Sequence, residues 1–108
     1  MDEYSLIVSA QNGEKEAFQR LIALYYPYIS KFLMKLCKDE ILSEDLTQDT
    51  FVKLIRGIDH FDIHGRASFS TYATTAARNC YIDYLRRNKQ IYLSIEEFEI
   101  ESNIDLQM

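Results

Sequence analysis

Apolar side chains recur every three to four residues along most of this chain, a spacing typical of helices that bury one face. A first helix is expected over residues 3–11, and the turn-forming pair Asn12-Gly13 ends it. A second helix is expected to begin near Glu14, with an interruption or kink at Pro27. The first third of the chain is therefore predicted to form two consecutive helices.

The same spacing predicts two further helices. The third is expected to begin at Ser43, a residue type that often caps a helix N-terminus. Residues 59–68 are polar and are predicted to form a loop, after which Ser68 or Ser70 opens a fourth helix that ends near Lys89. The side chains expected on its inward face are Ala73, Ala76, Ala77, Cys80 and Tyr84.

Composition supports a single all-α domain. The chain has 108 residues with only three glycines and one proline, which disfavours a turn-rich β fold. We expect a compact bundle of about four helices in residues 1–89 and an acidic C-terminal tail in residues 90–108. The tail alternates apolar and acidic residues, so it is a linker, a strand-like segment or a docked helix.

Several functional classes are disfavoured by what the chain contains. Its apolar runs are too short to span a membrane, so no membrane insertion is expected. Cys37 and Cys80 form no CxxC pair and, together with His60 and His64, make no metal set, so we predict no metal and no cofactor. No nucleophile elbow, phosphate-binding glycine loop or facing pair of carboxylates is present, so no enzyme is expected. Reduced thiols in a cytoplasmic protein are the simplest interpretation.

Charge is unevenly distributed along the chain. The formal net charge is −5, which by itself disfavours a nucleic-acid binder. Residues 1–52 have a net charge of −4, residues 53–89 of +4 and residues 90–108 of −5. The middle segment therefore has the charge of a phosphate-binding surface or of an ordinary solvated helix, and charge alone does not separate the two.

Two helix faces carry residues that a helical core does not require. The third helix has such a face at Asp45, Gln48, Asp49, Val52 and Arg56. It is either a protein interface or a solvated face with one exposed valine. The fourth helix has another at Thr71, Thr75, Arg78, Asn79, Ile82, Arg86 and Lys89. Such residues can contact phosphates and base edges, whereas compensation of the helix dipole accounts only for the basic residues of the last turn.

Three aromatic residues, Phe61, Phe69 and Tyr72, border the predicted loop. An aromatic ring beside a basic helix suits single-stranded DNA, because an unstacked base can stack on the ring. We expect Phe61 and Phe69 to belong to the core instead. For Tyr72 the sequence leaves both roles open.

Several short segments, in this order along the chain, resemble region 2 of the sigma-70 family. Residues 45–49 (DLTQD), 58–62 (IDHFD) and 69–74 (FSTYAT) are similar to the family patterns DLxQE, DxFE and FSTYAT, and the alignment needs no gap. Residues 10–18 (AQNGEKEAF) and 77–87 (ARNCYIDYLRR) are similar to the AQxGDxEAF and ARNxxxDxxRR segments of the extracytoplasmic-function group. Each segment is weak alone, but their common order over most of the chain is specific.

The resemblance implies a sigma factor domain that binds core RNA polymerase and recognises and melts the promoter minus-ten element. It implies that the third helix docks on the β′ clamp-helix coiled coil through Asp45, Gln48 and Asp49, with Val52 and Ile55 as apolar neighbours. An anti-sigma factor is a further partner that such a protein can have.

The resemblance also implies contacts with the non-template strand of the minus-ten element. Thr71, Tyr72 and Asn79 stand at family positions that touch bases. Arg78, Arg86 and Arg87 are expected to contact phosphates. The remaining expected DNA contacts are Arg56, His60, Thr75, Ile82 and Lys89.

Some positions depart from the family patterns. Thr75 and Ala76 stand where housekeeping sigma factors have two tryptophans, and Ala67 stands where they have a loop aromatic. The extracytoplasmic-function group captures a flipped base in a loop pocket, which corresponds here to about residues 62–68. Tyr72 replaces the tryptophan usual in that group. The expected melting apparatus is therefore a reduced one.

Two alternatives stay open at this point. A sigma-like interaction protein or co-sigma would bind polymerase or a partner without its own promoter recognition. Residues 90–108 resemble the start of an acidic linker, which belongs either to a longer sigma factor or to a natural single-domain protein.

Overall fold

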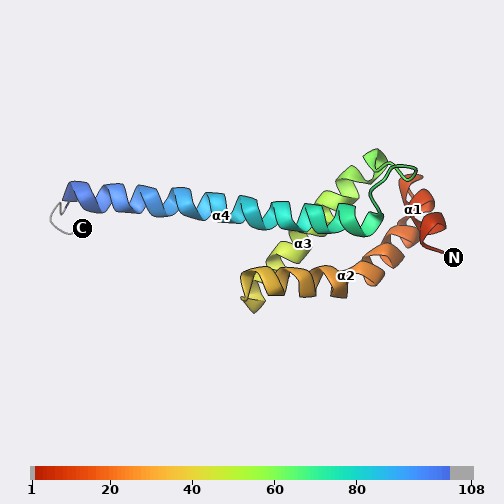
Figure 1. Cartoon of the computed structure of the whole chain (residues 1–108), viewed down its shortest axis with the longest axis horizontal. Coiled ribbons are helices and arrows are strands. Elements are labelled where there is room, and N and C mark those ends of the chain that lie inside the picture. Colours follow the sequence, from red (N-terminus) through yellow and green to blue (C-terminus); the bar gives the residue numbers. More distant parts are fainter. Residues whose placement is uncertain (1, 103–108) are drawn as a thin grey trace.

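The structure is a computed structural model that describes the backbone of residues 2–102 and the side chains of residues 2–89. Its elements are α1 (Glu3–Gln11), α2 (Lys15–Cys37), α3 (Glu40–Gly57), a short 3-10 helix η1 (Ile58–His60) and α4 (Phe69–Ser102) (Figure 1). Within these residues there is no strand. The predicted all-α bundle of about four helices is confirmed.

The first two helices pack against each other and are joined by a tight turn. Asp2 caps α1, because its carboxylate accepts a hydrogen bond from the backbone N–H of Ser5 at 2.8 Å. Gly13, which has a φ of 89°, allows the chain to turn back into α2. Tyr25 of α2 donates a hydrogen bond to the carboxylate of Glu3 at 2.5 Å, and burial together with this carboxylate raises the pKa of Tyr25.

Helix α2 contains its proline. Of the two alternatives predicted at Pro27, an interruption or a kink, the interruption is excluded, because one helix runs from Lys15 to Cys37. The helix changes direction part-way along its length (Figure 1), which agrees with the predicted kink. It ends at Lys38, which has a left-handed φ of 54° and whose N–H bonds to the carbonyl of Met34.

Helix α3 begins one turn earlier than predicted. Asp39 is the N-cap, and its carboxylate accepts a hydrogen bond from the N–H of Leu42 at 3.0 Å. The prediction that Ser43 caps this helix is wrong, because Ser43 is buried inside it and donates its hydroxyl to the carbonyl of Glu40 at 3.0 Å. Asp39 directly follows the turn at Lys38, so the earlier of two competent caps is used.

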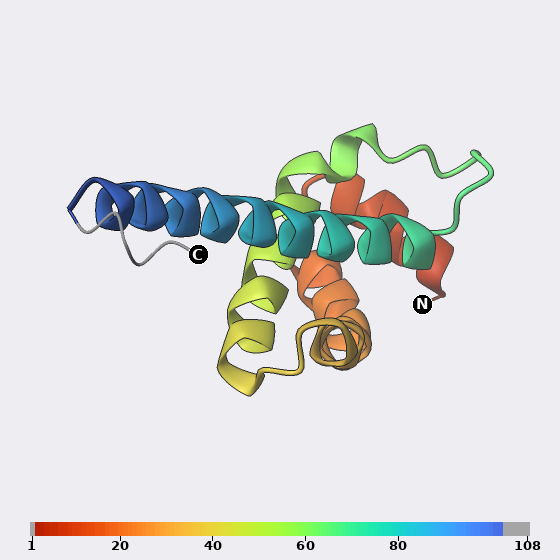
Figure 2. The same ribbon diagram turned by 60° about the vertical axis from the view of Figure 1, so that its left-hand side comes forward.

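Helix α4 begins as predicted but extends further. The backbone N–H of Thr71 bonds to Ser68 Oγ at 3.1 Å, which confirms Ser68 as the residue that opens the helix. The predicted end near Lys89 is wrong, since the helix continues to Ser102 and projects beyond the other helices (Figures 1 and 2). Residues 90–102 contain neither glycine nor proline, and basic side chains alone do not stop a helix.

The predicted boundary between residues 89 and 90 thus falls within a continuous helix. Up to residue 102 the tail is neither an extended linker nor strand-like. The prediction of an acidic tail concerns the side chains of residues 90–108, which lie outside the side chains that the structure describes.

The core is shared by α1, α2, α3, η1 and the first half of α4. Ile29 and Leu33 of α2 are fully buried, as are Ala73 and Ala77 of α4, and Cys80 is 3% exposed. Of the predicted inward residues of α4, the remaining two, Ala76 and Tyr84, are partly buried and pack against this core. Small side chains on α4 therefore let it approach α2 and α3 closely, as the sequence predicts.

The core makes a direct prediction for stability. Leu33→Ala should lower the free energy of unfolding by about 2–5 kcal/mol, because it removes a fully buried side chain and leaves a cavity. Leu24→Ala on the same helix is the matched control, since Leu24 is 58% exposed and its loss should change stability by no more than about 0.5 kcal/mol. Urea unfolding followed by circular dichroism measures both, and equal effects would contradict this packing.

Candidate nucleic-acid interface

The outer side of α4 is a continuous exposed face. It lies opposite the buried stripe of Ala73, Ala77 and Cys80. Every residue that the sequence places on this face is exposed: Thr71, Thr75, Arg78, Asn79, Ile82, Arg86 and Lys89. The helix therefore presents hydroxyl, amide and basic groups in one row, which can contact both bases and phosphates.

Arg78 is held in place by a neighbouring helix. Its guanidinium carbon lies 5.9 Å from the centre of the Phe32 ring of α2, within cation–π distance. Nearby, Ser70 donates a hydrogen bond to the Tyr28 hydroxyl at 3.3 Å. These contacts fix the exposed face of α4 relative to α2, so Arg78 is positioned rather than merely solvated.

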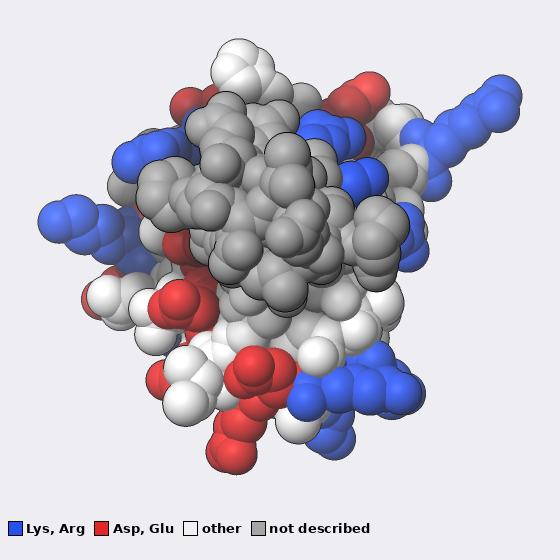
Figure 3. Space-filling model, turned by 90° about the vertical axis from the view of Figure 1, so that its left-hand side faces the viewer, with Lys and Arg blue, Asp and Glu red and all other residues white. Residues whose placement is uncertain are grey.

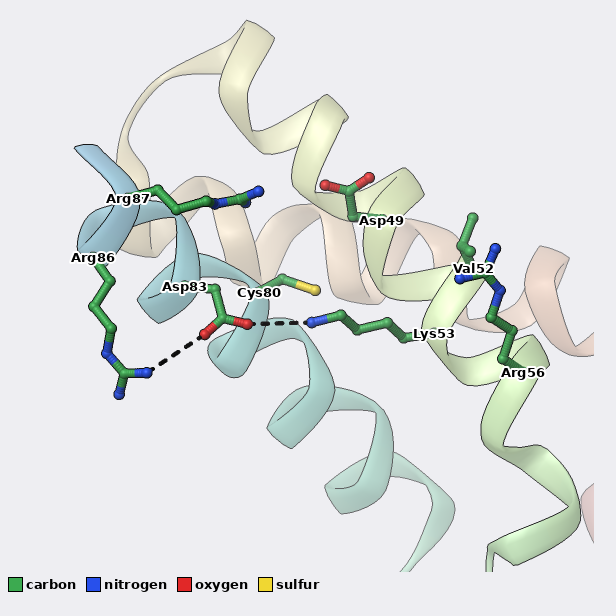
Figure 4. A pocket seen from close by; sticks show the side chains of 8 residues that line it. All are labelled: Asp49, Val52, Lys53, Arg56, Cys80, Asp83, Arg86 and Arg87. Atoms are coloured by element: carbon green, nitrogen blue, oxygen red, sulfur yellow. Dashed lines mark hydrogen bonds and ion pairs between the residues drawn. The ribbon is translucent and has the colours of Figure 1, made fainter. Parts of the chain in front are cut away.

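A groove of about 460 Å³ separates α3 from the second half of the described α4 face. It is lined by Asp49, Val52, Lys53, Arg56, Cys80, Asp83, Arg86 and Arg87 (Figure 4). The Asp83 carboxylate holds two of the cations, Lys53 at 3.4 Å and Arg86 at 3.8 Å. Arg87 extends from α4 on the Asp49 side of the groove, so it does not belong to the same row as Arg86 (Figure 4).

The loop between η1 and α4 is anchored by aromatic packing. Phe69 is 4% exposed, and its ring lies 5.4 Å from Phe61 and 5.7 Å from Tyr72, centre to centre. Tyr25 of α2 closes the cluster at 5.2 Å from Phe69. The prediction that Phe69 is a core residue is confirmed, and Phe61 is partly buried and packs against the same core.

The sequence left open whether Tyr72 packs in the core or faces a ligand, and in the structure it both packs against the core and lines a pocket. Its ring is partly buried at 5.0 Å from that of Phe61, and burial raises the pKa of its hydroxyl. A Cβ added to Gly57 would lie 2.9 Å from this hydroxyl, so the glycine leaves the space that the phenol occupies. Tyr72 also lines a surface pocket.

That loop pocket has a volume of about 420 Å³. Its lining residues are His60, Phe61, Asp62, Gly65, Arg66, Ala67, Thr71, Tyr72 and Thr75. Its wall thus combines aromatic rings, hydroxyl groups of α4 and one arginine. A pocket was predicted near residues 62–68. In the structure, residues from the start of α4 also line it.

Gln11, at the end of α1, fixes the shape of this loop. Its side-chain amide donates two hydrogen bonds, to the carbonyl of Ile58 at 2.9 Å and to that of Phe61 at 2.8 Å. Within the loop, the Asp62 carboxylate accepts a hydrogen bond from the N–H of His64 at 2.9 Å. Sequence reasoning assigned no role to Gln11, because its partners are 47 and 50 positions away.

The predicted polymerase-binding residues form an exposed strip on α3. Asp45, Gln48 and Asp49 are exposed, and the apolar side chains of Val52 and Ile55 are 45% and 43% exposed. Asp49 and Val52 also line the groove toward α4. The strip therefore borders the basic groove, and the two predicted surfaces meet along it.

Both signs of charge occur around the face seen from the α4 end. Asp and Glu side chains are most numerous at the lower left and also occur along the upper edge, while Lys and Arg side chains project at several separate places around the edge (Figure 3). Among the residues that the structure describes, no three His, Cys, Asp or Glu side chains are placed to share a metal ion.

The family of this chain is identified by its similarity to known proteins. The family model for sigma-70 region 2 matches residues 21–91. The chain belongs to the sigma-70 region 2 family. The resemblance inferred from the sequence motifs is thereby confirmed.

Relatives of this sigma-70 region 2 chain are extracytoplasmic-function (ECF) sigma factors. It is 32% identical over 84 residues to the ECF RNA polymerase sigma factor BldN of Streptomyces coelicolor. This alignment covers 78% of this chain and 31% of BldN. It is 31% identical over 77 residues to the ECF RNA polymerase sigma factor SigX of Bacillus subtilis, which covers 71% of this chain and 39% of the relative. The chain thus spans well under half of the length of these two relatives.

A solved structure shows the same fold. The sigma-70 region 2 chain resembles an engineered region 2 of sigmaE, determined by NMR in complex with GTAAAA, with a TM-score of 0.75 and 26% sequence identity. The likeness covers 83% of this chain and 92% of that chain. In the described part of the molecule, no helix is both long and apolar enough to cross a membrane.

The role of Gln11 in this region 2 domain can be tested directly. Gln11→Ala should destabilise the domain by about 1–3 kcal/mol, because two carbonyl groups lose their donor. It should also speed amide hydrogen exchange in residues 61–68 more than elsewhere. Gln19→Ala, at an exposed glutamine of α2, is the control. Unchanged exchange in the loop would contradict the anchoring role of Gln11.

Proposed function

We propose that this domain binds core RNA polymerase and recognises and melts the promoter minus-ten element during transcription initiation, in the cytoplasm and without catalysis. The observation that supports this most strongly is the continuity of the exposed α4 face with the loop pocket. Thr71 and Thr75 belong to both, so one DNA strand can follow the helix and place a base in the pocket. The similar sigmaE region 2 structure is a complex with GTAAAA, which supports a short nucleic-acid segment as the ligand.

The energetics of base capture fit such a site. Flipping a base out of a duplex costs a few kcal/mol, and stacking on an aromatic side chain returns about 1–3 kcal/mol per base. Tyr72 offers a ring in the pocket wall, while Thr71 and Thr75 offer hydroxyl groups for base edges. Binding therefore stabilises the unpaired strand once it forms, with no need for nucleotide hydrolysis.

The phosphate contacts and the remaining base contact complete the proposed DNA surface. Arg78 and Asn79 lie in mid-helix, with Arg78 held over Phe32. We assign the rest of the DNA surface to Arg56, His60, Ile82, Arg86, Arg87 and Lys89. The net charge of −5 is compatible with this role, because polymerase supplies further positive surface in the assembled enzyme.

We assign polymerase binding to the exposed strip of α3. Val52 and Ile55 provide an apolar patch, and Asp45, Gln48 and Asp49 place acceptors on its N-terminal side. A strip with this composition suits a partner with basic and apolar side chains, and we assign it to the β′ clamp-helix coiled coil. An anti-sigma factor that covers the same strip would block this contact.

Two single substitutions test polymerase binding. Gln48→Ala and Asp49→Ala should each weaken binding to core RNA polymerase by about 1–2 kcal/mol, since each removes a polar contact at the edge of the apolar patch. Competition against a labelled housekeeping sigma factor measures the affinity. Glu16→Ala, an exposed carboxylate on α2, is the control for loss of one negative charge. Wild-type affinity in both α3 variants would exclude this strip as the docking site.

A triple substitution separates DNA recognition from polymerase binding. Changing Arg78, Arg86 and Arg87 to Ala should reduce promoter-directed transcription more than tenfold, because about three phosphate contacts are lost, while polymerase binding is retained. The charge-matched control changes Arg20, Lys31 and Lys35 to Ala, three exposed cations of α2. If transcription survives the α4 triple change, the protein is instead an interaction protein or co-sigma without promoter recognition of its own.

A further inference from the structure

The groove between α3 and α4 places cations from two helices around a single carboxylate. Lys53 Nζ of α3 lies 3.4 Å from Asp83 Oδ2, and Arg86 Nη1 of α4 lies 3.8 Å from Asp83 Oδ1. Lys53 and Arg86 reach the carboxylate from opposite sides (Figure 4). Asp83 therefore binds the cation of α3 with one carboxylate oxygen and the cation of α4 with the other. Among the described residues, no other carboxylate lies within ion-pair distance of Lys53 or Arg86.

The same two cations could hold a phosphate. Carboxylates and phosphates are both oxygen anions that lysine and arginine bind through charge-assisted hydrogen bonds. The side chains of Lys53, Asp83 and Arg86 are 51%, 48% and 74% exposed. Ion pairs with this exposure contribute little to stability, so an incoming anion can replace Asp83 without disturbing the fold.

The groove also lies beside the surface that the proposed function assigns to DNA. Arg56 and Arg87 line it, and Arg86 connects it to the exposed face of α4. A strand that follows this face reaches the groove at Arg86. Lys53, to which the sequence assigned no role, is the one additional cation that the groove supplies from α3.

We propose that the α3/α4 groove binds a backbone phosphate of promoter DNA and that Asp83 occupies this place in the free protein as an internal competitor. When DNA binds, the phosphate replaces the carboxylate between Lys53 and Arg86. Asp83 thereby weakens binding to DNA of any sequence, because part of the positive charge is already neutralised. The inference rests on the proposed function, since it concerns the same DNA surface.

The sign of one mutational effect separates this role from a structural one. If Asp83 competes with phosphate, Asp83→Asn frees both cations and tightens DNA binding. If Asp83 instead holds Lys53 and Arg86 in the geometry that DNA requires, the same substitution weakens binding. The isosteric amide keeps the volume of the side chain and removes only its charge.

The experiment measures binding of the full 108-residue chain to a fluorescein-labelled DNA duplex by anisotropy, between 50 and 200 mM salt. Asp83→Asn should bind about two- to fivefold more tightly at low salt, the range expected for an exposed ion pair. Its slope of log affinity against log salt should change by less than about 0.9, the value for one whole phosphate, because the groove phosphate is bound in both proteins. Asp59→Asn, at an exposed carboxylate of η1 outside the groove, controls for net charge and should change affinity less.

A second pair of variants tests the site itself. Lys53→Gln alone should change affinity little, because this lysine is already paired. Combined with Asp83→Asn, it should return the affinity to about the wild-type value. Additive effects of the two substitutions would contradict a shared phosphate site.

The possible failures are distinguishable. If wild-type protein binds DNA and Asp83→Asn binds equally or more weakly, Asp83 is not a competitor, but the proposed function stands. If neither protein binds any DNA, either alone or together with core RNA polymerase, the proposed function fails as well. Circular dichroism of each variant shows that the helical fold is retained.

Discussion

Helix α4 lies close to α2 and α3 because the side chains at the contact are small. Ala73 and Ala77 are fully buried at this contact and Cys80 is nearly so. This close approach determines which side of α4 faces solvent, how wide the groove toward α3 is, and where Phe69 enters the core. Both proposed binding surfaces therefore depend on the packing of one narrow stripe.

The loop pocket depends on the same packing at its other end. Phe69 begins α4 and joins Phe61 and Tyr72 in one aromatic cluster, so the loop starts and finishes on the core. Gln11 then fixes the loop from α1. A pocket built in this way is largely formed before a ligand arrives, which reduces the conformational entropy lost on binding.

Local periodicity was sufficient to predict the helices, the buried stripe of α4 and its exposed opposite face. Ser68 was also predictable, because an N-cap acts within three residues. Contacts over long sequence separations were not: Lys53 and Asp83 are 30 positions apart, and Gln11 is 47 positions from Ile58. The misplaced start of α3 has a different cause, because Asp39 and Ser43 are both competent caps and the preceding turn at Lys38 selects the first. The end of α4 was misjudged since a basic turn resembles a helix terminus without requiring one.

The most direct measurement is an NMR titration of the isotope-labelled chain with single-stranded DNA of the sequence GTAAAA, which the similar sigmaE region 2 structure contains, and with a pool of other single-stranded hexamers. The same sequences as duplexes serve as the comparison. Capture of an unpaired base predicts that the single strands shift the signals of the loop pocket, above all Thr71, Tyr72 and Thr75, and that the duplexes leave Tyr72 unchanged. Equal shifts with single strands and duplexes, or shifts that avoid the pocket, would contradict base capture at this site.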